Sequence, residues 1–401
     1  MKSIRHIVML ALPRHDEKFN STSWQLATSF VSQGVDVFYI DHPYTWTDFF
    51  KNFYKGAFIK AFINTFFPQW KLVNGVRVLS PVLFIPINFL SNGKTYRALN
   101  HFNQLGLSKV INRQLRKQKV CAYSLINSFD FYLNEIHHLL KAPSQFIYHC
   151  IDPMIKPYTR KHGLRQELQI ASDADKVIVT APALAQKFRK LGKDTYLVPN
   201  AADVEKCMKA LEKETTPDAI IEKIRRPILG YLGNIERRID FELLLETAER
   251  LSEWNIVLVG PREEQYIPET FKNHPRIHLI PQVKSEEIPS VLKTFDVGMI
   301  PFKKDEASSG IYPLKLYEYL AAGLPVTSTS FNIEILKDFE EGVLYLANSP
   351  EEFANQANKA FLANSEEQVT ERVTIAKKNS WVHRTTDFLG ILEKDKKCQV
   401  H

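Results

Sequence analysis

The chain alternates short apolar runs with stretches of helical periodicity along nearly its whole length. Short apolar runs bounded by turn residues are typical of strands buried on both faces, as in parallel sheets covered by helices. We therefore expect an α/β protein. Helices are expected between the strands, notably over 21–33 and 165–173. The expected strands of the first half are 6–11, 36–40, 76–80, 122–126, 145–150, 176–180 and 195–199.

A second series of the same kind begins near residue 227. Its expected helices are 240–252 and 285–294, with further helices to about residue 393. Between the two series, the charged stretch 201–226 is interpreted as the crossing between domains. Periodicity alone allows two unrelated Rossmann-like domains. The expected strands of the second half are 227–233, 255–260, 276–280, 296–301, 324–329 and 342–346.

Composition limits the class of protein. The 401 residues suffice for two domains of ordinary size, and the four cysteines have no metal-binding spacing, which favours reduced thiols in the cytoplasm. The first apolar run, 6–11, is far too short to span a bilayer. A formal charge of +7 favours anionic partners, and no nucleic-acid-binding motif accompanies it, so no nucleic-acid partner is expected.

The most specific segment is 308–326, which reads as a polar loop, a helix and a turn into a buried strand. Free N–H groups and the helix dipole at such a start favour a phosphate. Lys315 and Glu318 lie one turn apart on the helix. A carboxylate there is placed to accept both hydroxyls of a ribose. The candidate phosphate-binding residues at the start are Ser308, Ser309, Gly310 and Ile311.

Within this segment, ProLeuLysLeuTyrGluTyrLeuAlaAlaGly resembles the nucleotide-sugar signature of bacterial, group-1-like GT-B glycosyltransferases, which include enzymes of surface polysaccharide and teichuronic-acid-type biosynthesis. The resemblance implies two Rossmann-like domains facing across a cleft and a ribose contact by Glu318. It further implies an acceptor-side domain at 1–203, a nucleotide-sugar-binding domain at 204–375, and a helix at 376–401 packing back on the first domain. The usual motif has a glutamate where this chain has Gly310, which leaves the sugar and the retaining mechanism open.

Other donor-side candidates follow from the same resemblance. The loop after the expected strand 227–233 contains Gly233, Arg237 and Arg238. The two guanidinium groups either pair with a diphosphate or form a solvated face. A backbone contact from Val283 to the nucleobase is also expected.

The candidate catalytic groups lie at the end of the expected strand 145–150. The resemblance to an inverting member of the wider group makes Asp152 the candidate base for an acceptor hydroxyl, although Asp before a proline is also a common turn residue. His149 is the alternative base. The loop after the first strand supplies acceptor-side candidates, namely Arg14, His15 and Asp16.

In residues 48–71, aromatic residues and lysines interleave with no acidic residue after Asp48. The pattern fits a bilayer interface, a site for an acceptor lipid, or a helix packed on the first domain. Together these features predict a cytoplasmic, membrane-peripheral glycosyltransferase that moves a sugar from a nucleotide diphosphate sugar to a glycan or lipid-linked acceptor. No cofactor and no metal are expected. A sugar-nucleotide epimerase and a non-catalytic binding paralogue remain as alternatives.

Overall fold

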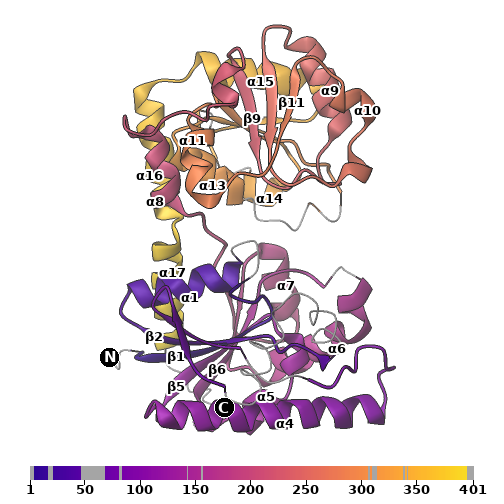
Figure 1. Cartoon of the computed structure of the whole chain (residues 1–401), viewed down its shortest axis with the longest axis vertical. Helices are drawn as coiled ribbons and strands as arrows, with labels where there is room; N and C mark the ends of the chain where they lie inside the picture. Colours follow the sequence, from indigo (N-terminus) through magenta and orange to yellow (C-terminus); the bar gives the residue numbers. More distant parts are fainter. Residues whose placement is uncertain are drawn as a thin grey trace. The chain divides into compact units, whose positions relative to one another are not determined.

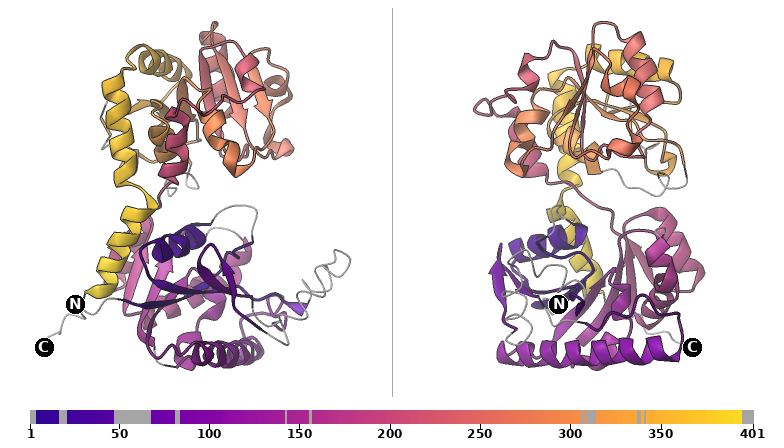
Figure 2. Two further views of the ribbon diagram at one scale, coloured as in Figure 1. Left: turned by 60° about the vertical axis from the view of Figure 1, so that its left-hand side comes forward. Right: turned by 45° about the vertical axis from the view of Figure 1, so that its right-hand side comes forward.

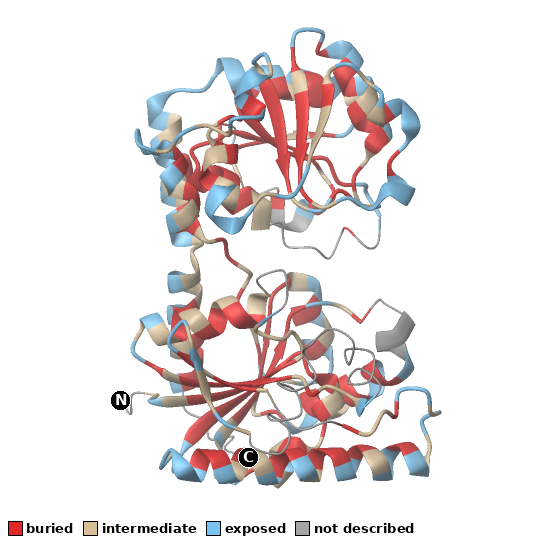
Figure 3. Cartoon of the chain, viewed as in Figure 1, coloured by how far each residue is buried: buried red, intermediate tan, exposed pale blue. Residues whose placement is uncertain are grey.

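The computed structural model describes residues 4–16, 21–46, 68–80, 84–141, 143–154, 157–305, 308, 314–336, 339–340 and 342–394. The chain forms two compact units, shown in Figure 1. Unit 1 contains Met1–Pro199 and Thr385–His401, and unit 2 contains Asn200–Arg384. Each unit has its own sheet, whose strands are almost entirely buried (Figure 3).

Unit 1 is built on a sheet of order β3-β4-β2-β1-β5-β6-β7-β8. All pairings are parallel except that of β3 with β4 at the edge. The order reverses between β1 and β5, so the carboxyl ends of these two strands form the switch point where α/β sheets bind ligands. The strands are β1 His6–Ala11, β2 Asp36–Asp41, β3 Lys71–Val73, β4 Val76–Leu79, β5 Tyr123–Ser128, β6 Pro143–Cys150, β7 Lys176–Val179 and β8 Thr195–Leu197.

Helices cover both faces of this sheet (Figure 2). On one face, Leu107 and Ile111 of α4 pack in a cluster with Leu10 and Leu125. On the other face, Phe30 of α1 meets Phe388 of α17 edge to face, with ring centroids 5.5 Å apart. The helices are α1 Thr22–Ser32, α4 Lys94–Lys117, α5 Ile136–Leu139, α6 Pro157–Asp173, α7 Pro182–Lys190 and α17 Trp381–Glu393.

Unit 2 is built on a parallel sheet of order β11-β10-β9-β12-β13-β14. The order reverses between β9 and β12, which places a second switch point at their carboxyl ends. The strands are β9 Ile228–Leu232, β10 Asn255–Val259, β11 Ile277–Ile280, β12 Val297–Ile300, β13 Val326–Thr329 and β14 Leu344–Ala347.

Two groups of helices pack on the sheet of unit 2 (Figure 1). One group contains α8, α11, α13 and α16, and the other contains α9 and α15. The helices are α8 Val204–Met208, α9 Phe241–Arg250, α10 Glu269–Lys272, α11 Ile288–Leu292, α13 Leu314–Ala321, α14 Ile333–Leu336, α15 Pro350–Leu362 and α16 Glu366–Lys378.

The interpretation of 201–226 as an inter-domain crossing is wrong. Asp203 accepts a hydrogen bond from the backbone N–H of Lys206 and caps α8, while Cys207 and Ile221 lie in the core of unit 2. The stretch is rich in charged residues, but its few apolar residues are buried in unit 2. The second unit therefore begins at Asn200 and includes the whole stretch 201–226. At the other end, unit 1 resumes at Thr385, within α17, compared with the expected boundary after 375.

The longest helix, α4, was not predicted. Its buried stripe combines Leu107 and Ile111 with Asn100, Asn103 and Gln104, so the apolar periodicity is interrupted. The amide of Asn103 pairs with both backbone groups of Ile85 at 3.0 Å, which satisfies the buried polar atoms. Across the residues that the structure describes, no helix combines the length and apolar character needed to cross a membrane.

Candidate active site

The centre of the unit 2 site is the close backbone approach after β9 and β10. Gly233 follows β9, has a φ of +149°, and donates its N–H to the carbonyl of Val259 at 2.8 Å. A Cβ added to Gly260 would lie 2.1 Å from the Gly233 carbonyl oxygen, so a side chain is excluded there. The glycines let two loops meet at the carboxyl edge of the sheet.

Lys315 extends from α13 into this corner. A Cβ added to Gly233 would lie 2.2 Å from Lys315 Cε and 2.4 Å from Lys315 Nζ. Because glycine has no side chain, the space occupied by the end of Lys315 stays free. Its ammonium lies 5.5 Å from the ring centroid of Tyr231, an arrangement in which the ring stabilises the cation. Burial lowers the pKa of Lys315, and the nearby Glu318 carboxylate opposes this shift.

Glu318 lies one turn further along α13 and is half-buried. Burial raises its pKa, while the charges of Lys315 and Lys206 oppose the shift and Asp203 adds to it. Asp203 and Lys206 form an ion pair of 2.8 Å at the start of α8. The site therefore combines two ammonium groups with two carboxylates. The ammonium groups can bind the anionic part of a ligand, and a carboxylate can accept hydrogen bonds from its hydroxyl groups. Lys206 was not among the residues predicted from the sequence, because its approach to Glu318 depends on the packing of α8 against α13.

The remaining donor-side candidates are placed differently. Arg238 pairs with Glu236 and lies 5.8 Å from the ring centroid of Phe302, whereas Arg237 is exposed. Val283 is half-buried and packs against the unit 2 core.

Only part of the predicted phosphate loop can be placed. Ser308 is fully buried and donates its N–H to Asp305 Oδ1 at 2.8 Å. Its Oγ has no hydrogen-bond partner among the residues described. Ser309, Gly310 and Ile311 lie outside the described residues.

In unit 1, His149 belongs to the core. Its side chain is 2% exposed, meets the ring of Phe388 edge to face at 5.4 Å, and its Nδ1 pairs with Ser128 Oγ at 3.0 Å. Burial lowers the pKa of His149 to about 3, so the imidazole is neutral near pH 7. The neighbouring Tyr148 is equally buried because both faces of the sheet are covered. This burial argues against contact between His149 and a substrate.

Asp152 follows β6 and is exposed at the carboxyl edge of the sheet. Its backbone carbonyl accepts the Cys150 thiol at 3.7 Å. Asp152 is therefore accessible to solvent, and a residue that removes a proton from an acceptor hydroxyl must be accessible.

The three acceptor-side candidates converge on a residue that the sequence did not indicate, Asp41 at the end of β2. Asp41 is fully buried and accepts the Nδ1 and backbone N–H of His15, at 2.8 and 2.9 Å. Arg14 lies 3.3 Å from Asp41 and 3.2 Å from the exposed Asp16. Burial alone would raise the pKa of Asp41, but the hydrogen bond from His15 and the charge of Arg14 outweigh it and lower the pKa.

A second His–Asp pair lies beside this group. His42 follows β2, and its Nδ1 lies 2.8 Å from Asp130 Oδ2. Asp130 is fully buried, and its Oδ1 has no hydrogen-bond partner in the part of the chain that is described. Both pairs lie at the carboxyl ends of β2, β1 and β5, beside the switch point. The sequence signal that could have indicated these pairs was the polar AspHis dipeptide, Asp41 and His42, directly after the expected strand 36–40.

Two described clusters have the composition of a metal site: His15 with Asp16 and Asp41, and His137 with His138 and Asp173. In the first, Asp41 already accepts the His15 donors and a bond of 2.7 Å from Ser80 Oγ. The Arg14 guanidinium beside it further disfavours a cation. The first cluster is therefore better suited to proton chemistry than to metal binding.

Comparison with known proteins agrees with this arrangement. Residues 226–362 match the family model described as Glycosyl transferases group 1. TuaH of Bacillus subtilis (strain 168), provisionally named a teichuronic acid biosynthesis glycosyltransferase, is 24% identical over 257 residues. This match covers 59% of the chain and 64% of TuaH, so it spans less than two thirds of that relative.

Solved structures extend the likeness to nearly the whole chain. Sucrose-phosphate synthase from Thermosynechococcus elongatus has a TM-score of 0.64 at 15% identity, over 97% of this chain and 98% of that one. Anabaena Alr3699/HepE, solved with UDP and glucose, has a TM-score of 0.61 at 13% identity, over 97% and 99%. The predicted GT-B fold and the resemblance to group-1-like glycosyltransferases are confirmed.

Proposed function

We propose that this protein is a glycosyltransferase that moves a sugar from a nucleotide diphosphate sugar to a hydroxyl group. One observation carries the proposal: Lys315 lies against Gly233 at the switch point of the unit that matches the group 1 family, and its charge acts on Glu318, one turn further along the same helix. The expected acceptor is a glycan or lipid-linked glycan of bacterial surface polysaccharide synthesis. The TuaH match and the HepE complex with UDP support the pathway and a UDP-type donor, respectively.

In this proposal the donor is held at its two polar ends. Glu318 accepts hydrogen bonds from the ribose hydroxyls, and Lys315 pairs with the diphosphate beside the open backbone of Gly233. Ser308, Ser309, Gly310 and Ile311 precede the same helix and supply backbone N–H groups. Arg238 adds a second positive charge near the diphosphate, and Val283 supplies a backbone contact to the base. Arg237 remains a solvent-side partner of the phosphates.

Transfer also requires removal of the acceptor proton. Asp152 remains our proposed base because its carboxylate is exposed at the carboxyl edge of the sheet. The His15–Asp41 pair is a second candidate, since a buried carboxylate on Nδ1 orients the ring and leaves Nε2 to accept a proton. His149 was the sequence-based alternative, and its burial makes it a supporting residue in this proposal.

A matched pair of variants separates the two bases. Asp152→Asn and His15→Gln each retain shape and hydrogen bonding while removing basicity. The variant that lacks the base should lose about a hundredfold or more in kcat, with UDP affinity retained. The other variant should stay within a few fold of wild type. Wild-type rates in both variants would exclude Asp152 and His15 as the base.

The activity itself is tested by screening purified protein with nucleotide sugars and lipid-linked acceptors. Donor-dependent product should appear with wild type and be lost in Lys315→Met. A control outside the proposed site, Lys272→Met on α10, should be unaffected. Conversion of the nucleotide sugar without any acceptor would instead indicate an epimerase. Because the diphosphate is held by side chains and backbone, turnover should persist in EDTA.

We also propose that 48–71 docks the protein on an anionic membrane from the cytoplasmic side. Most of this segment, 48–67, lies outside the described residues, and the flanking Trp46 and Leu72 are exposed. Lysines near such a surface contribute up to about 1 kcal/mol each. Aromatic residues add burial that salt does not screen. Replacing Phe62, Phe66 and Phe67 with Ser should remove the salt-resistant part of liposome binding.

A further inference from the structure

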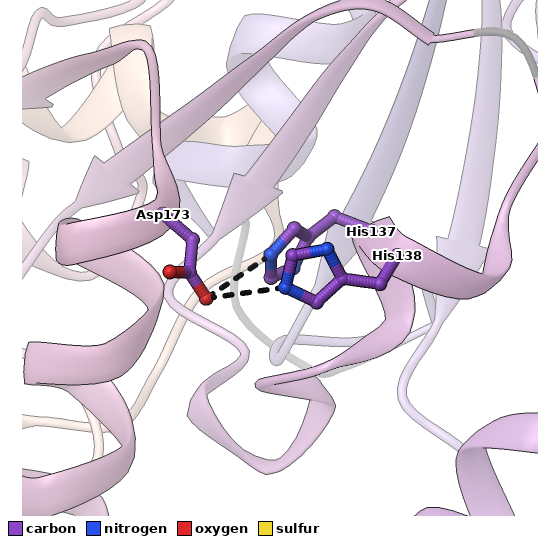
Figure 4. A group of neighbouring side chains, drawn as sticks. All are labelled: His137, His138 and Asp173. Carbon is purple, nitrogen blue, oxygen red and sulfur yellow. Dashed lines mark ion pairs between the residues drawn. The ribbon is translucent and has the colours of Figure 1, made fainter.

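An unassigned cluster lies at the amino-terminal edge of the unit 1 sheet. His137 and His138 are neighbours on α5, which precedes β6, and Asp173 ends α6, just before β7. Figure 4 shows both imidazole rings turned toward the same carboxylate oxygen of Asp173. The proposed donor and acceptor groups lie at the carboxyl ends of the strands. The cluster is therefore separate from the site described above.

The spacing of the three groups matches a tetrahedral ion. His137 Nε2 lies 3.2 Å and His138 Nε2 lies 3.5 Å from Asp173 Oδ2. Zinc–nitrogen and zinc–oxygen bonds of about 2.0–2.2 Å place adjacent tetrahedral ligands about 3.3–3.5 Å apart. All three ligand atoms lie within 4.8 Å of one another. They can therefore share one ion with little movement of the backbone.

Hydrogen bonds between the three side chains do not explain why they lie together. The His137 side chain is 6% exposed, and its polar contact is the 3.2 Å approach of Nε2 to Asp173 Oδ2, which does not have the geometry of a hydrogen bond; Nδ1 has no hydrogen-bond partner among the described residues. Its ring stacks on Phe146 at 4.2 Å with an interplanar angle of 8°, which fixes its orientation. A buried imidazole normally has a partner because an unsatisfied polar atom is costly. An ion bound beside Nε2 would supply that partner.

We propose that His137, His138 and Asp173 bind a divalent transition metal of the zinc class. Two imidazole nitrogens and one carboxylate oxygen are ligands that zinc favours. His138 is 64% exposed, so the ion can enter from solvent and hold water in its fourth position. Bound there, the ion links α5 to the end of α6 and stabilises unit 1. It takes no part in sugar transfer.

The test uses the full chain, treated with EDTA and dialysed free of chelator. Titration with Co²⁺ should give one equivalent with visible d–d absorption, and Zn²⁺ should displace it. At Zn²⁺ concentrations about 100-fold above Kd, the melting temperature should rise by several degrees because the ion binds only the folded state. Failure to bind a stoichiometric ion would overturn the proposal.

His138→Ala and Asp173→Asn each remove an accessible ligand and avoid the buried His137. Each should weaken Zn²⁺ affinity by about 100-fold or more and abolish the rise in melting temperature. The control is His101→Ala, because His101 is an exposed histidine paired with a single carboxylate, Glu135, at 3.0 Å. Wild-type affinity in both ligand variants would place the ion elsewhere and refute the assignment. Circular dichroism confirms that each variant is folded before titration.

Discussion

The ribose contact assigned to Glu318 gives the sharpest test of the donor site. Glu318→Gln keeps the shape of the side chain and one acceptor oxygen but removes the charge, while Glu318→Ala removes both acceptors. Hydrogen bonds to a charged group contribute about 1.5–3 kcal/mol, and each 1.4 kcal/mol is roughly tenfold in affinity. We therefore expect UDP to bind about tenfold more weakly to Glu318→Gln and about 100-fold more weakly to Glu318→Ala.

Isothermal titration calorimetry with UDP and with its 2′,3′-dideoxy analogue isolates the contact. Wild type should discriminate against the analogue, whereas Glu318→Ala should bind the two ligands nearly equally. Glu246→Gln is the matched control, because Glu246 is also a helical carboxylate paired with a cation, Arg250 at 3.2 Å, but it is exposed on α9. An equal loss of affinity for both ligands in Glu318→Ala would refute a ribose contact.

Three further predictions follow from other parts of the chain. Gly233→Ala should weaken UDP binding and cost about 1–3 kcal/mol of stability, because its Cβ would displace Lys315 and the φ of +149° is strained for alanine. Unchanged UDP affinity would show that the position of Lys315 beside Gly233 does not matter for binding. The pKa of His149, lowered to about 3, makes wild type lose about 1.4 kcal/mol of unfolding free energy per pH unit as the pH falls from about 6.5 toward 3. His149→Asn should flatten this dependence in urea titrations, and parallel curves would refute it. Liposome co-sedimentation should increase with anionic lipid and fall only partly in high salt, and a protein that ignores liposomes at low salt would exclude docking through 48–71.

The sequence by itself determined the order of most elements and indicated the central residues of the proposed donor site. The expected strand 6–11 coincides with β1, and the expected helix 240–252 contains α9. Helical and strand periodicities are local, so a contiguous pattern reveals them without knowledge of the fold. Lys315 and Glu318 could be assigned for the same reason, because they lie one turn apart in a single segment. In α4 the apolar periodicity is interrupted by buried polar residues, so the local pattern did not reveal the helix.

Only the tertiary structure decided which distant residues meet. The pairing of His15 with Asp41 depends on β1 and β2 being neighbours in the sheet, and that of His137 with Asp173 on the packing of α5 against the end of α6. His149 looked like an accessible base, but Phe388 of α17 covers it. Burial and pairing depend on segments far away along the chain. Their electrostatic consequences therefore arise only when the chain has folded.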